Sequence, residues 1–260
     1  MIRTVLITRY VTPLREGGSL PAIVEADDLG TYVLKFRGAG QGPKALIAEL
    51  VAGEIARHLG LPVPDLVFAQ LDPALGRSEA DAEVRDLINR SAGLNLAVDY
   101  LPGSFAYEAA MPPPIDAATA SAIVWFDAYV TNVDRSPRNT NMLLWHRKLW
   151  LIDHGAALNF HFNWPRYRER IPDPFPLIKD HVLLRFAGAL READQRLGPL
   201  LTSETLSAII ALVPDEWLRG DPSLPEASAV RSGYLEYLTG RAAQSHIFLE
   251  EALRARSLLV

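Results

Sequence analysis

The most constraining feature of the sequence is an ordered series of polar residues within 126–158. A predicted helix ends at Asn132, Asp134 follows on a short loop, and Asn139 comes shortly after it. Two short apolar runs then predict a β-hairpin, and the second run ends at Asp153. This order brings two carboxylates and a carboxamide to one end of the hairpin.

These residue types are the ones that phosphoryl transfer requires. One aspartate must orient or deprotonate the attacking hydroxyl group, while an asparagine and a second aspartate must hold Mg²⁺ on the phosphates. Oxygen ligands suit Mg²⁺, which proteins bind partly through the phosphates of the substrate. Taken singly, each residue is also typical of a turn or a cap. The joint pattern of Asp134, Asn139 and Asp153 favours the phosphoryl-transfer interpretation.

The N-terminal part of the chain adds a candidate ion pair. Lys35 lies inside an apolar strand, where an unpaired ammonium group would be costly. Glu49, in the predicted helix 44–59, is the natural partner, and Glu54 is the alternative. A lysine–glutamate pair between a strand and a helix positions nucleotide phosphates in kinases. The competing interpretation is a solvated Glu49 with a Lys35 that reaches past apolar surface to water.

The predicted elements change in character along the chain. A proline-rich run at 102–114 separates a part rich in strands from a part rich in helices. This order predicts an α+β fold of two lobes, a β-rich N-lobe at 1–102 and an α-rich C-lobe at 103–260. The predicted strands are 4–11, 22–25, 31–36, 65–71, 94–100, 142–145 and 149–152, and the predicted helices are 44–59, 78–89, 116–131, 178–197, 202–212 and 225–256.

Composition excludes several classes of function. The 260 residues include 26 basic and 31 acidic ones, so the net charge of −5 argues against a protein that coats nucleic acid. The chain has no cysteine, which excludes disulfides, thiolate zinc sites and a cysteine nucleophile. No apolar run approaches the roughly 18 residues of a membrane helix. We therefore expect a cytoplasmic protein that binds neither nucleic acid nor membrane.

Six segments together resemble the HipA-like kinase family, in a compact form that lacks the family's separate N-terminal domain. Between them they cover residues from about 10 to 160, and the helical remainder carries no segment that matches. The segments are GGS at 17–19, YVLKF at 32–36, E-x6-A-x3-G-L-x-V-P at 49–64, VDYLPG at 98–103, NVDRSPRNTN at 132–141 and LIDHGAAL at 151–158.

The resemblance implies a two-lobed protein-kinase-like fold with ATP bound between the lobes. On this match, Lys35 contacts the ATP phosphates and Glu49 holds Lys35. Asp134 is the catalytic base. Asn139 and Asp153 are the Mg²⁺ ligands, and Asn141 is the alternative to Asn139.

Two further segments complete the nucleotide site that the resemblance implies. Gly17, Gly18 and Ser19 would cover the phosphates, and the backbone at Tyr100 and Leu101 would meet the adenine. Because no serine or threonine lies between positions 153 and 199, a switch by serine or threonine phosphorylation in that segment is excluded, and Ser19 is the candidate in its place.

Three neighbouring residues carry open interpretations. Arg135 and Arg138 either steady the charge of the transferred phosphoryl group or pair with acidic neighbours. His154 stands where protein kinases carry phenylalanine, and we interpret it as a packing residue. The loop after Asp134 also lacks the histidine that many relatives place there.

The expected activity is phosphorylation of serine or threonine in a protein substrate. Some family members are toxins held by a DNA-binding antitoxin, so an antitoxin-like protein is a further candidate partner. The alternatives are a small-molecule or lipid kinase of the same superfamily and a catalytically dead nucleotide-binding module. A metal-dependent hydrolase using Asp134, Asp153 and His154 would leave Lys35 and Glu49 without a role.

Overall fold

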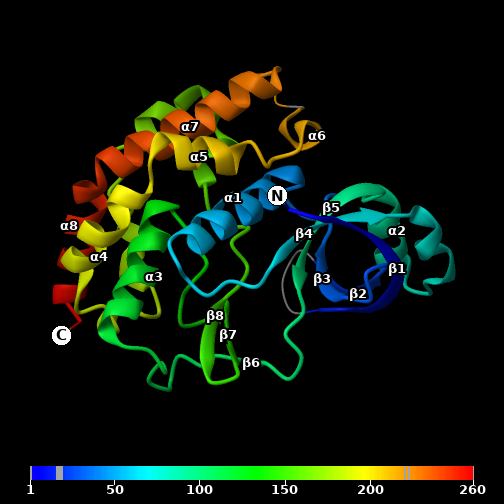
Figure 1. The fold of residues 1–260 in the computed structure, drawn as a ribbon, viewed down its shortest axis with the longest axis horizontal. Coiled ribbons are helices and arrows are strands. Elements are labelled where there is room, and N and C mark those ends of the chain that lie inside the picture. The colour runs from blue at the N-terminus through cyan, green and yellow to red at the C-terminus, as the bar shows by residue number, and fades with distance from the viewer. Residues whose placement is uncertain (1, 16–19, 220, 222, 260) are drawn as a thin grey trace.

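A computed structural model describes residues 2–15, 20–219, 221 and 223–259. Its strands gather mainly at one end of the molecule and its helices at the other, with α1 between them (Figure 1). The predicted phosphate loop at 17–19 lies outside the described residues. None of the helices in the described ranges is long and apolar enough to cross a lipid bilayer.

Five strands close into a barrel in the order β1-β2-β3-β5-β4. β1 pairs with β2 in antiparallel and with β4 in parallel orientation, which closes the ring. Alternate side chains point inward, so Val24, Leu34 and Ala97 are fully buried in the barrel. The strands are β1 (Thr4–Pro13), β2 (Ala22–Ala26), β3 (Thr31–Lys35), β4 (Leu66–Leu71) and β5 (Gly93–Asp99), and α2 (Ala82–Arg90) packs against them.

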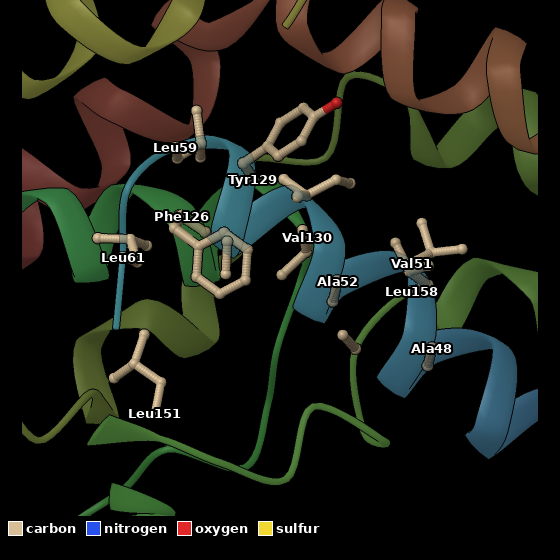
Figure 2. Packing of buried hydrophobic residues seen from close by; sticks show 14 of the residues in the cluster. Ala48, Val51, Ala52, Leu59, Leu61, Phe126, Tyr129, Val130, Leu151 and Leu158 are labelled. Carbon is tan, nitrogen blue, oxygen red and sulfur yellow. The ribbon is translucent and has the colours of Figure 1, made fainter. Parts of the chain in front are cut away.

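Helix α1 (Pro43–His58) is buried over much of its surface. It begins with proline, which suits the first turn of a helix, and it ends just before Gly60, whose positive φ of 75° suits glycine. Ala48, Val51 and Ala52 point toward side chains of the helical part (Figure 2). A helix that is apolar on most sides is buried.

The helical part is built around α3 (Ala117–Tyr129). The side chain of Asp116 caps its first turn, and the buried Arg241 donates to the backbone oxygens of Ala128 and Tyr129 in its last turn. A cation suits the C-terminal end of a helix because carbonyl groups there lack partners within the helix. The other helices are α4 (Leu190–Leu197), α5 (Ser203–Ile210), α6 (Asp215–Leu218), α7 (Ala227–Ala243) and α8 (Ser245–Ser257).

A hairpin with a short third strand lies below α1 in Figure 1. β7 (Met142–Trp145) and β8 (Lys148–Leu151) pair in antiparallel orientation, which confirms the predicted hairpin with its second strand displaced by one residue. β6 (Phe105–Ala106), from the proline-rich run, adds to β7. The end of β8 sets the position of Asp153.

Two helices, α1 and α6, help to join the two parts of the molecule. The larger apolar cluster combines α1 with α3 and with Leu66 and Leu96 of the barrel strands. Short helix α6 also reaches the barrel, because Glu216 pairs with Arg37 at 2.7 Å and Trp217 donates to the Leu94 carbonyl at 3.3 Å. Since α1 shares its core with the helical part, the boundary between 102 and 103 stays a prediction.

Two predicted helices differ from the structure. In place of one helix at 178–197 there are 3₁₀ turns at Pro176–Asp180 and Leu184–Phe186, followed by α4. The reason is tertiary: the Val182 N–H donates to the Arg135 carbonyl and the Leu183 N–H to the His181 ring, so neither continues a helix.

The predicted helix 225–256 is divided at Gln244. The backbone there has φ −116° and ψ 28°, which separates α7 from α8. The break allows α8 to pack across α3, where Phe248 meets the edge of Trp125 at a ring-centroid distance of 5.5 Å. Packing against a helix far away in the sequence therefore overrides a continuous helical pattern.

Candidate active site

Lys35, Glu49 and Asp153 meet in one ion-paired group. The Lys35 Nζ lies 2.7 Å from Glu49 Oε2 and 2.7 Å from Asp153 Oδ1. The side chain of Glu49 is 2% exposed and that of Asp153 is 49% exposed. The predicted pair of Lys35 and Glu49 is confirmed, while Glu54 instead pairs with Arg57 at 3.1 Å. One carboxylate is therefore buried behind the lysine and the other faces solvent.

Electrostatics keeps this group charged. Burial disfavours the carboxylate of Glu49, but the Lys35 ammonium, aided by His154, outweighs it and lowers the pKa of Glu49 to about 2. Burial likewise disfavours the Lys35 ammonium, but Glu49 and Asp153 outweigh it and raise the pKa of Lys35. At neutral pH a fixed positive charge therefore stands beside an exposed carboxylate.

His154 packs behind the ion pair. Its side chain is buried and meets Phe126 edge-on, with 5.7 Å between the ring centroids. This confirms the predicted packing role. The sequence did not indicate a second contact, in which Nδ1 lies 3.9 Å from Glu49 Oε1. Lys35 and His154 thus flank the two oxygens of Glu49.

The loop after α3 presents Asp134. The Asn139 amide nitrogen donates to Asp134 Oδ2 at 2.9 Å, and that of Asn141 donates to the Asp134 backbone carbonyl at 2.5 Å. The Asn141 backbone oxygen accepts the Ile152 N–H at 3.0 Å. Asn141 therefore connects the Asp134 loop to the residue before Asp153. The loop of Asp134 and Asn139 thus adjoins the ion-paired group that contains Asp153.

The side chain of Arg135 is buried and pairs with a carboxylate of the protein. Its Nε donates to Asp127 Oδ2 at 2.6 Å, and both side chains have no exposed surface. Of the two interpretations of Arg135, the pairing with an acidic neighbour is confirmed and the steadying of phosphoryl charge is wrong. Arg138 is exposed and its role stays a prediction.

Asp127 and His181 are site neighbours that the sequence interpretation missed. His181 Nε2 lies 2.9 Å from Asp127 Oδ2. Burial disfavours the carboxylate, but Arg135 and His181 outweigh it and hold the pKa of Asp127 well below its usual range. The available signal was a lone aspartate within the apolar helix of residues 117–129, which needs a partner when buried.

The predicted adenine contact lies at the link that follows β5. The Tyr100 N–H donates to the Thr31 carbonyl at 3.0 Å, and the Leu101 carbonyl accepts the Ser104 N–H at 3.1 Å. Leu101 is buried. Backbone hydrogen bonds therefore hold the link at Tyr100 against β3 and close a turn from Leu101 to Ser104. Its contact with adenine stays a prediction.

The fold is that of kinases. Three solved structures resemble it. The proinflammatory kinase CtkA of Helicobacter pylori has a TM-score of 0.59 at 11% identity, covering 98% of this chain and 99% of that one. The Golgi casein kinase has a TM-score of 0.52 at 14% identity, covering 98% of this chain and 74% of that one. The structure of the Golgi casein kinase with Mn/ADP bound has a TM-score of 0.52 at 14% identity, covering 99% of this chain and 75% of that one. The predicted two-lobed α+β kinase fold is confirmed.

The model of the HipA-like kinase family matches residues 7–238, and the chain belongs to this family. The resemblance read from the sequence motifs is confirmed, and the match extends through α5, α6 and most of α7, where no motif had been recognised. No curated protein matches the sequence significantly. Membership makes the protein a kinase, a phosphotransferase.

Lys35 and Glu49 should be energetically coupled. Changing either to alanine should lower kinase activity, and the double change should cost much less than the two losses combined. Residues in direct contact commonly couple by about 0.5–3 kcal/mol. A double-mutant cycle on turnover rates measures this. Glu54→Ala is the matched control, because Glu54 lies on the same helix and should combine additively with Lys35→Ala. Additive losses for Lys35 and Glu49 would contradict the prediction.

Proposed function

We propose that the protein is an ATP- and Mg²⁺-dependent kinase that phosphorylates serine or threonine in a protein substrate. The observation that carries the proposal is the ion-paired group of Lys35, Glu49 and Asp153, which Asn141 connects to the loop of Asp134. A charged lysine, a solvent-facing carboxylate and a second carboxylate on a loop are the parts that phosphoryl transfer needs.

Each residue has a separate task in this proposal. Lys35 binds nucleotide phosphates as a point charge, and Glu49 keeps its ammonium in place from the buried side. Asp134 accepts the proton of the substrate hydroxyl. Asn139 occupies one of its oxygens, Oδ2, so the other oxygen remains for the substrate. The backbone at Tyr100 and Leu101 would contact the adenine.

The donor set fits Mg²⁺. Asp153 offers a half-exposed carboxylate, and Asn139 uses its amide nitrogen on Asp134, which leaves its amide oxygen for a cation. In the described part of the chain no group of three or more His, Asp or Glu side chains would hold a metal alone. Phosphates would thus complete the ligand set, as is usual for Mg²⁺. When bound, the ion neutralises phosphate charge.

Two observations support the finer points. The amide nitrogens of Asn139 and Asn141 both donate to Asp134, but Asn139 is exposed and Asn141 is partly buried, which favours Asn139 as the metal ligand. The Golgi casein kinase structure, which has the same fold, was solved with Mn/ADP bound. A nucleotide with a divalent ion is therefore a suitable ligand for this site too.

The direct test is transfer from γ-labelled ATP with Mg²⁺ to the proteins, lipids and small molecules of a cell extract. We expect label in protein, with phosphoserine or phosphothreonine after acid hydrolysis. Label found in lipid or in small molecules alone would favour the other kinase classes and overturn the protein substrate. Nucleotide binding without any transfer would show a catalytically dead module. The Asp134→Asn variant controls for contaminating kinases.

Replacing Asp153 with asparagine should remove the enhancement of nucleotide binding by Mg²⁺. The variant loses the exposed carboxylate that faces the proposed ion, while the buried pair of Lys35 and Glu49 remains. Isothermal titration with a non-hydrolysable ATP analogue, with and without Mg²⁺, measures the effect. Asp86→Asn, on the outer helix α2, should behave like the wild type. Equal Mg²⁺-dependence in Asp153→Asn and the wild type would refute the metal assignment.

A further inference from the structure

A buried polar cluster adjoins the loop of Asp134. The carboxylate of Asp127 accepts from Arg135 Nε at 2.6 Å and from His181 Nε2 at 2.9 Å through one oxygen, and from Asn132 Nδ2 at 2.8 Å through the other. The exposed fractions are 0% for Asp127, 2% for Arg135, 3% for Asn132 and 7% for His181. The loop after α3, through Asn132 and Arg135, and the distant residue His181 thus converge on one buried carboxylate.

The hydrogen bonds define the state of the His181 ring. The Leu183 N–H donates to Nδ1 at 3.0 Å, so Nδ1 carries no proton. The ring proton therefore sits on Nε2 and is donated to Asp127. These two contacts give the His181 ring one orientation.

The cluster fixes the backbone on both sides of Asp134. Two positions before it, Asn132 accepts the Asp134 N–H through its side-chain oxygen at 3.2 Å. One position after it, Arg135 donates through Nη1 to the Asn141 carbonyl at 2.5 Å. Since Asn132 and Arg135 both bind Asp127, the placement of Asp134 depends on that carboxylate.

His181 adds a long-range constraint. It lies 54 positions after Asp127, between two 3₁₀ turns. The next residue, Val182, donates its N–H to the Arg135 carbonyl at 3.1 Å. The segment after the metal-site aspartate is thereby joined to the Asp134 loop by one side-chain and one backbone hydrogen bond.

We propose that Asp127 and His181 are positioning residues that hold Asp134 in place for phosphoryl transfer. This inference rests on the proposed role of Asp134 as the base. A buried ion pair is weak as a source of stability, because apolar residues of similar volume often serve as well or better. The hydrogen bonds of Asp127 instead fix the backbone around Asp134, which apolar side chains at the same positions would not do.

The test compares two variants of His181. His181→Phe removes both the donor to Asp127 and the acceptor for the Leu183 N–H, whereas the glutamine amide of His181→Gln retains a donor for Asp127. His181→Phe should lower kcat about 100-fold, since a misplacement of about 1 Å costs this much. The KM for ATP and the binding of an ATP analogue should not change. His181→Gln should recover most of the rate.

The controls separate this inference from the proposed function. His58→Phe, at an exposed histidine that contacts Leu200, should leave kcat unchanged. Full activity of His181→Phe beside an inactive Asp134→Asn would overturn the positioning role alone. Thermal melting measures how much of each variant is folded. If both His181 variants lose activity equally, and only in proportion to their loss of folded protein, the positioning role is also overturned. Full activity of Asp134→Asn would overturn the base assignment itself.

Discussion

Replacing Asp134 with asparagine should lower the rate of phosphoryl transfer by about 10²–10⁴-fold, the usual contribution of a positioned general base. The amide has the same shape as the carboxylate but does not accept the proton of the substrate hydroxyl. Its side chain faces Asn139 in a partly exposed loop, so the change should leave the fold intact. Single-turnover transfer from γ-labelled ATP measures the rate.

Nucleotide binding should distinguish this variant from one at the metal site. Lys35, Glu49 and Asp153 form no hydrogen bond with the Asp134 side chain, and the amide oxygen of the variant can still accept from Asn139. The affinity for an ATP analogue with Mg²⁺ should therefore equal that of the wild type. Asp86→Asn serves as the carboxylate control. A transfer rate within tenfold of the wild type would exclude Asp134 as the base.

The sequence was sufficient to predict those parts of the site that are formed by elements next to each other in the chain. A lysine inside an apolar strand needs an acidic partner, and the next helix offers Glu49 on its buried side. The hairpin follows from two apolar runs, and it places Asp153 close to the Asp134 loop. In both cases the contacts link elements that are consecutive in the chain.

The rest of the site depends on contacts that the sequence pattern does not contain. His181 reaches Asp127 across 54 positions, and the surrounding segment reads as a helix until its backbone hydrogen bonds are taken by Arg135 and by the His181 ring. For Arg135 the sequence left two interpretations, because an arginine beside a catalytic loop suits phosphate as well as a buried carboxylate. Only the fold shows that Asp127 faces it.

Replacing Asp127 with alanine should destabilise the protein by about 3–5 kcal/mol, the usual cost of leaving one member of a buried ion pair without its partner. The Arg135 guanidinium would keep its charge in a site with no exposed side-chain surface. Urea unfolding of the wild type and the variant measures the difference. Glu250→Ala is the control, because it breaks an exposed pair with Arg191 and should cost about 1 kcal/mol or less.

The double variant Asp127→Leu with Arg135→Met separates stability from positioning. It removes both charges and fills the site with apolar atoms, so it should recover most of the stability that Asp127→Ala loses. Transfer should nevertheless stay about 100-fold slow, because Asn132 and Asn141 lose the hydrogen bonds that fix the Asp134 loop. A double variant that is both stable and fully active would show that the cluster only fills space. A loss below 1 kcal/mol in Asp127→Ala would contradict the buried pair itself.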